Sequence, residues 1–156
     1  MRTDRASRLI KAPLATLYRA FIDPEVLVRW LPPEGMTGEM LEFDARAGGG
    51  YRMALRYDDA DQAGKTSAHE DVVAVRFLKL VPEKLILQAA DFGSEDPAFA
   101  GTMTMIWSFE AAGDGARVAI TCENVPQGIA RRDHVVGLKS SLANLAALVE
   151  GGGQPN

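Results

Sequence analysis

The stretch from Ile10 to Pro33 constrains the fold more than any other part of the chain. It contains two prolines, Pro13 and Pro24, and each stands where a helix would begin. Proline is tolerated at the first helical position because that N–H has no partner within the helix anyway. Apolar residues with helical spacing follow the first proline: Leu14, Leu17, Tyr18 and Phe21. We therefore expect a strand that leads directly into two short helices.

The second of these helices has its own start signal. Asp23 directly precedes Pro24 and is a preferred type of N-cap residue. The apolar positions of this helix are Val26, Leu27 and Trp30. Two short helices in succession after a strand are expected to bend over a sheet and close one end of its apolar face.

The middle of the chain has the period of two that is typical of half-buried strands. We predict strands over 40–43, 51–57, 66–80 and 84–90, with Gly48 to Gly50 and Pro82-Glu83 as turns between them. A final hairpin turns at Gly113 to Gly115. Its two inward faces are expected to carry Met103, Met105, Trp107 and Phe109 on one strand and Val118, Ile120 and Cys122 on the other.

The period becomes helical from Arg132 to Glu150. Leu138, Leu142, Leu145 and Val149 form one apolar stripe. A curved antiparallel sheet must cover its apolar face, and this helix is the only large element available to do so. The sequence thus predicts an α+β, helix-grip fold in one domain over residues 1–150, with a disordered tail at 151–156.

Composition excludes several classes of function. The 156 residues carry a net charge of −4, whereas binding to nucleic acid or to an anionic membrane requires a basic face. A single cysteine rules out an internal disulfide, and no apolar run is long enough for a signal peptide or a membrane span. Two histidines and one cysteine without close spacing do not predict a metal site. We expect a cytoplasmic protein without metal or cofactor.

Four motifs in this order resemble a known family. They are Ala12-Pro13 with Asp23-Pro24 and Arg29-Trp30; the glycine hairpin DARAGGGY from Asp44 to Tyr51; Val81-Pro82-Glu83-Lys84-Leu85; and His134 with Gly137 and Leu142 in the last helix. The chain resembles the activator of heat-shock-protein-90 ATPase homologue-like proteins of the START/Bet v 1-like (SRPBCC) superfamily. The resemblance extends from Arg8 to Val149 and implies the same helix-grip fold, which hosts lipid carriers, cyclases and hydrolases.

Two positions depart from the family pattern. Leu31 and Leu138 stand where many members carry tryptophan at positions that face the cavity. The smaller side chains imply a larger pocket or a different ligand. The namesake activators contact their chaperone through a separate N-terminal domain, so the resemblance alone does not imply a chaperone partner.

We predict a binding protein for a small hydrophobic molecule, held between the sheet and the last helix. Methionines recur among the inward residues, and flexible thioethers suit surfaces that accept varied ligands. The expected lining comprises Trp30, Met36, Met53, Leu55, Tyr57, His69, Met103, Met105, Trp107, His134, Leu138 and Leu142. A core filled by these same side chains is the alternative.

Three further hypotheses stay open. A cyclase- or hydrolase-like enzyme would use His69 or His134 as a general acid or base, and would need a carboxylate within hydrogen-bond reach of the imidazole. A chaperone-partner module is the second. Exposed strand edges would allow a homodimer, which is the third.

Overall fold

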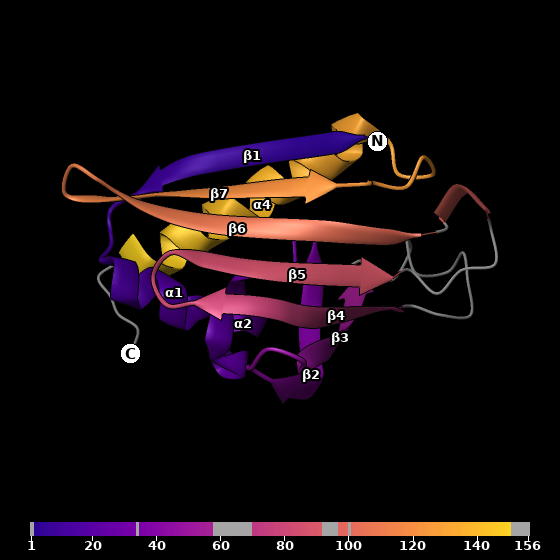
Figure 1. The fold of residues 1–156 in the computed structure, drawn as a ribbon, viewed down its shortest axis with the longest axis horizontal. Coiled ribbons are helices and arrows are strands. Elements are labelled where there is room, and N and C mark those ends of the chain that lie inside the picture. The colour runs from indigo at the N-terminus through magenta and orange to yellow at the C-terminus, as the bar shows by residue number, and fades with distance from the viewer. Residues whose placement is uncertain (1, 34, 58–69, 92–96, 100, 151–156) are drawn as a thin grey trace.

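A computed structural model describes residues 2–33, 35–57, 70–91, 97–99 and 101–150. The described elements follow one another as β1 (Thr3–Ile10), α1 (Leu14–Ile22), α2 (Pro24–Trp30), β2 (Met36–Asp44), β3 (Gly50–Tyr57), β4 (Glu70–Val81), β5 (Leu85–Asp91), η1 (Pro97–Phe99), β6 (Thr102–Ala112), β7 (Gly115–Glu123) and α4 (Arg131–Glu150). The strands form one antiparallel sheet in the order β1-β7-β6-β5-β4-β3-β2. The three α-helices lie on the same side of this curled sheet, behind it in Figure 1. The predicted helix-grip fold is confirmed.

The second short helix begins at Pro24 as predicted, and the first begins at Leu14, one residue after Pro13. Pro13 adopts extended backbone immediately before α1, and its carbonyl oxygen accepts the first helical hydrogen bond, from the Leu17 N–H at 3.0 Å. The Asp23 carboxylate caps α2 by accepting from the Glu25 N–H at 3.0 Å. The Trp30 indole N–H then donates to the carbonyl of Ala20 at 2.9 Å, which ties α2 back to α1.

Strand positions agree with the prediction better than strand ends do. β2 begins at Met36, before the expected start at Met40, and β5 is shifted by one residue. β4 begins at Glu70, and residues 66–69 of the predicted strand lie outside the described residues. The β6–β7 hairpin has the predicted turn: Ala112 pairs with Gly115 across two residues, of which Gly113 has the positive φ that favours glycine.

Hydrogen bonds attach the long helix α4 to the rest of the fold in its middle and at its end. Its backbone lies closest to β1 and α2. In its middle, the Ser141 hydroxyl donates to the carbonyl of Leu31 at 2.7 Å and the Asn144 amide donates to the carbonyl of Pro32 at 3.0 Å. At its end, the Glu150 carboxylate accepts from the Lys11 N–H at 2.8 Å. No helix among the described residues is long and apolar enough to cross a bilayer.

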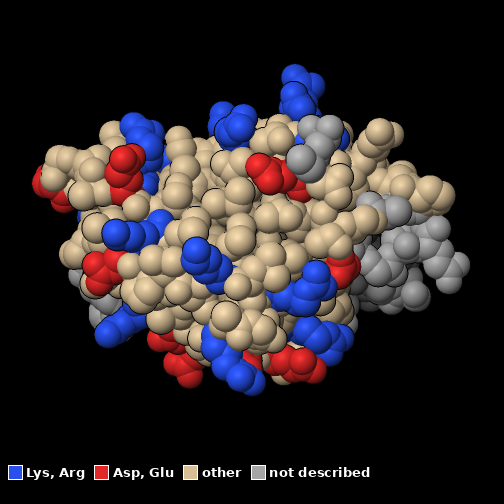
Figure 2. All heavy atoms as spheres, viewed as in Figure 1, with Lys and Arg blue, Asp and Glu red and all other residues tan. Residues whose placement is uncertain are grey.

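The outer face of the sheet carries charges of both signs. Figure 2 shows Lys and Arg side chains scattered among Asp and Glu side chains around a broad uncharged area. Cross-strand ion pairs join Arg52 to Glu42 at 3.3 Å and Arg56 to Glu39 at 2.7 Å on this face. Charges of both signs are therefore interspersed over the visible face of the described residues.

Candidate functional site

A single row of side chains crosses the concave face of the sheet beneath the helices. Antiparallel pairing places Phe77 opposite Gln88, Gln88 opposite Met105, Met105 opposite Cys122, and Cys122 opposite Asp4. Neighbours in such a row are about 5 Å apart. Four of the five residues are buried, and Met105, at the centre of the row, remains partly exposed. The middle of the concave face is therefore less tightly covered than its surroundings.

Aromatic rings fill the face on the side of α1 and α2. The Phe21 ring lies at centroid distances of 4.7 Å from Trp30, 4.8 Å from Trp107 and 5.1 Å from Phe109, each at a steep interplanar angle. The two indoles lie 5.7 Å apart. Edge-to-face rings at these distances pack closely. Trp30 and Trp107, two of the predicted lining residues, are thus part of a packed aromatic cluster.

Gln88 is a polar residue in the central row, and sequence reasoning missed it. Only 3% of its surface is exposed. The Trp107 indole N–H donates to the Gln88 side-chain oxygen Oε1 at 3.1 Å. Because an indole N–H can only donate, this bond fixes which end of the amide faces Trp107. Gln88 shares one face of a buried strand with Ile86 and Ala90, and this alternation is the sequence signal that would have predicted its burial.

Cys122 lies between Met105 and Asp4 in the row and is fully buried. Burial raises the pKa of its thiol to about 12, and the charge of Asp4 acts in the same direction. The thiol therefore stays protonated near neutral pH, and a buried neutral thiol behaves as a small apolar group.

Asp4 ends the row and is the centre of a charged cluster that the sequence analysis also missed. Its side chain is completely buried. His134 Nδ1 lies 2.8 Å from its Oδ2, Arg2 Nη2 lies 2.9 Å from the same oxygen, and Arg131 Nε lies 3.1 Å from Oδ1. Burial alone would raise the pKa of Asp4, but hydrogen bonds and charges from Arg2 and His134 outweigh it and lower the pKa to about 2. We name Asp4, Arg2, Arg131 and His134 the Asp4 cluster.

The Asp4 cluster joins the first strand to the start of α4. His134 has the same helical phase as Leu138 and Leu142 and was predicted to line the cavity. Its Nδ1 faces a buried carboxylate from β1. Asp4 shares one face of the first strand with Ala6 and Ile10, and this alternation is the sequence signal that would have predicted a buried carboxylate.

The predicted apolar lining divides into two groups by exposure. Met53, Met103 and Leu142 are buried, as are the two tryptophans. Four residues are partly exposed: Met36, Leu55, Met105 and Leu138. His69 and the side chain of Tyr57 lie outside the described residues. Among the residues that the structure describes, no three His, Cys, Asp or Glu side chains converge as metal ligands.

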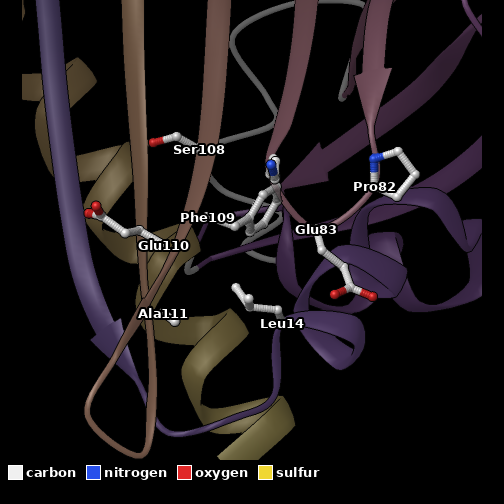
Figure 3. Close-up of a pocket in the computed structure, with 8 residues that line it drawn as sticks. Leu14, Pro82, Glu83, Ser108, Phe109, Glu110 and Ala111 are labelled. Carbon is white, nitrogen blue, oxygen red and sulfur yellow. The ribbon is translucent and has the colours of Figure 1, made fainter.

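An open groove of about 660 Å³ lies at another place, beside the start of α1 (Figure 3). Its lining comprises Leu14, Pro82, Glu83, Lys84, Ser108, Phe109, Glu110 and Ala111. The carboxylates of Glu83 and Glu110 point away from each other in Figure 3, so they do not form an acid pair. None of the predicted lining residues borders this groove.

Comparisons with known proteins agree with this architecture. The family model described as activator of Hsp90 ATPase homolog 1-like protein matches residues 11–150. No curated protein matches the chain.

Solved structures extend the similarity over nearly the whole chain. A protein from Chromobacterium violaceum is 35% identical, with a TM-score of 0.82 over 99% of this chain and 98% of that one. A protein from Mesorhizobium loti is 18% identical, with a TM-score of 0.77 over 98% and 100%. The Aha1 dimer from Colwellia psychrerythraea is 19% identical, with a TM-score of 0.70 over 98% and 100%, and so shares the fold. With its family model matched over most of its length, the chain belongs to the activator of Hsp90 ATPase homolog 1-like family.

Proposed function

We propose that this protein binds a small, mainly apolar molecule on the concave face of its sheet, beneath α4. The exposure of Met105 carries the proposal. Its neighbours along the row and along its own strand are buried, namely Gln88, Cys122, Met103 and Trp107. In a close-packed interior, a side chain surrounded in this way would be buried as well. Its partial exposure supports an open space over the middle of the sheet.

The position of α4 supports the same proposal. The backbone of α4 lies close to β1, α1 and α2. Leu138 reaches inward from this helix and is itself partly exposed. The family often has an indole at this position, and the smaller leucine leaves room. Flexible methionine and leucine side chains around that space suit an apolar ligand.

Filling the space tests the proposal. In the variant Met105→Trp, the larger side chain would occupy an open site at little cost, whereas in a closely packed core the overpacking would cost about 1–3 kcal/mol. We expect an unchanged or raised melting temperature. The matched control Met105→Leu conserves volume and is expected to be neutral.

Ligand binding by the wild type is the direct measurement. We expect saturable thermal stabilisation by members of a library of lipids and small aromatic molecules, and loss of that stabilisation in Met105→Trp but not in Met105→Leu. A library that stabilises none of the three proteins would contradict the proposal.

The His134–Asp4 pair favours a second candidate, a cyclase- or hydrolase-like enzyme. A carboxylate that holds Nδ1 orients the imidazole so that Nε2 can accept a proton, which is the arrangement of a general base. Turnover of a panel of esters and lactones, lost in His134→Gln with the fold intact, would support this candidate. Equal turnover by wild type and variant would remove it.

A chaperone-associated or dimeric module is the third candidate. Family membership and the dimeric relative from Colwellia psychrerythraea favour it. The molar mass in solution tests the dimer, and a pull-down with the purified chaperone tests the partner. A monomer that captures no chaperone at tens of micromolar would contradict both parts.

A further inference from the structure

The amide nitrogen of Gln88 is an unpaired donor at the centre of the concave face. Its partner atom Oε1 accepts from the Trp107 indole, and this bond directs Nε2 away from that indole. Nε2 has no hydrogen-bond partner among the described residues. Gln88 is almost entirely buried, so an amide nitrogen without a protein partner at this position needs an explanation.

The nitrogen borders open space. No side-chain nitrogen or oxygen of the described residues is both sealed from solvent and unpaired. Nε2 is unpaired, so the small exposed fraction of Gln88 must include it. Met105, the partly exposed neighbour of Gln88 in the row, borders the same region of the concave face.

A second polar atom on this face is also unpaired. Tyr51 is 5% exposed, and its hydroxyl has no hydrogen-bond partner among the described residues. The Tyr51 ring lies 5.9 Å from the ring of Phe77, which is the neighbour of Gln88 on β4. Burial raises the pKa of Tyr51, so its hydroxyl keeps its proton and can donate.

From these atoms we infer that the bound molecule carries a neutral carbonyl oxygen, as in a ketone, aldehyde or ester, and that the Gln88 amide donates to it. This inference rests on the proposed binding function and specifies its ligand class. Because Oε1 already accepts from the Trp107 indole, the group without a protein partner is the nitrogen, a donor, and it favours a ligand that accepts. An apolar molecule without an oxygen would leave that donor unpaired.

A carboxylate fits the site less well than a neutral carbonyl. The residues next to Gln88 in the row, Phe77 and Met105, carry no charge, and a buried anion needs a partner of opposite charge. The row itself contains no cationic residue, and at its Asp4 end Arg2 and Arg131 already bind the Asp4 carboxylate.

Three probes of nearly equal shape test the inference. They are naphthyl methyl ketone, isopropenylnaphthalene, in which a methylene group replaces the oxygen, and naphthoate. We expect the ketone to bind the wild type roughly five- to tenfold more tightly than the hydrocarbon, which is the usual worth of one hydrogen bond. Naphthoate is expected to bind more weakly than the ketone. Isothermal titration calorimetry measures all three.

Two variants test whether the Gln88 amide and the Tyr51 hydroxyl cause the preference for the ketone over the hydrocarbon. Gln88→Met removes the amide at nearly constant shape and is expected to abolish the preference for the ketone while the hydrocarbon still binds. Tyr51→Phe removes only the hydroxyl and is expected to reduce the preference by a smaller factor. Met105→Leu is the control, because it changes the apolar wall but keeps both donors and hence the ratio of affinities.

A measurement on the wild type covers the case in which Gln88→Met does not fold. In an isotope-edited NMR spectrum, the side-chain amide protons of Gln88 are expected to move downfield with the ketone and not with the hydrocarbon. Equal affinities for ketone and hydrocarbon, with no such shift, would overturn the inference and leave the binding function standing. Binding of none of the probes would count against the binding function itself.

Discussion

Two regions of the concave face differ in how they are filled. Near α1 and α2, the rings of Phe21, Trp30 and Trp107 pack edge to face and leave the two indoles buried. In the middle of the sheet, Met105 is partly exposed beside Gln88, whose amide nitrogen has no partner among the described residues. On one continuous surface, closely packed rings therefore stabilise one region, and another region carries a polar group without a protein partner. The difference teaches that apolar composition alone does not distinguish the closely packed part of this face from its incompletely packed middle.

The largest effect is expected in the closely packed region. Replacing Trp30 with alanine removes a fully buried indole, its ring contacts with Phe21 and Trp107, and its bond to the Ala20 carbonyl. We expect a loss of about 3–5 kcal/mol in the free energy of unfolding. Urea denaturation measures it. If Trp30→Ala lost less stability than Met105→Ala, the aromatic cluster would not be the more closely packed of the two regions.

The Asp4 cluster is expected to come next. In Asp4→Asn the carboxylate charge disappears, and Arg2, Arg131 and His134 are left without their anion. Breaking a buried ion pair in this way costs about 3 kcal/mol or more. Arg131→Gln removes only a partner whose side chain is 62% exposed, so it is expected to cost much less. Similar losses in both variants would show that the buried carboxylate is not the centre of the cluster.

Acid is expected to weaken the same cluster. The pKa of Asp4 is about 2 in the folded protein and 3.8 in the unfolded chain. Since the folded value is the lower one, the stabilisation is complete above pH 3.8 and is lost as the pH falls towards 2. The ionised Asp4 carboxylate thus contributes about 2 kcal/mol to the free energy of unfolding above this interval. The difference in stability between wild type and Asp4→Asn should shrink over this interval, and a difference independent of pH would contradict the assignment.

The smallest effect is expected on the outer face. The ion pair between Arg52 and Glu42 joins two exposed side chains at 3.3 Å, and such pairs contribute about 0–1 kcal/mol. Arg52→Ala should therefore leave both the urea midpoint and ligand affinity almost unchanged. A loss as large as that of Asp4→Asn would mean that the outer face contributes to stability in a way that its contacts do not explain.

The fold followed from local signals in the sequence, and the polar part of the candidate site did not. Prolines and an N-cap aspartate predicted the starts of α1 and α2, and the alternation of apolar residues predicted the faces of β6 and β7. The interaction of Asp4 with His134 joins residues from opposite ends of the chain, and no local pattern encodes such a pair. Gln88 was missed because a single polar residue in a buried strand acquires its meaning only from the strand beside it.

The sealed Cys122 thiol also has a practical consequence. It is the only cysteine of the chain, and its burial and raised pKa keep it unreactive while the protein is folded. A cysteine introduced at an exposed position such as Arg52 would react selectively with a maleimide dye. The natural chain is therefore already a suitable background for single-site fluorescent labelling, without prior removal of its own thiol.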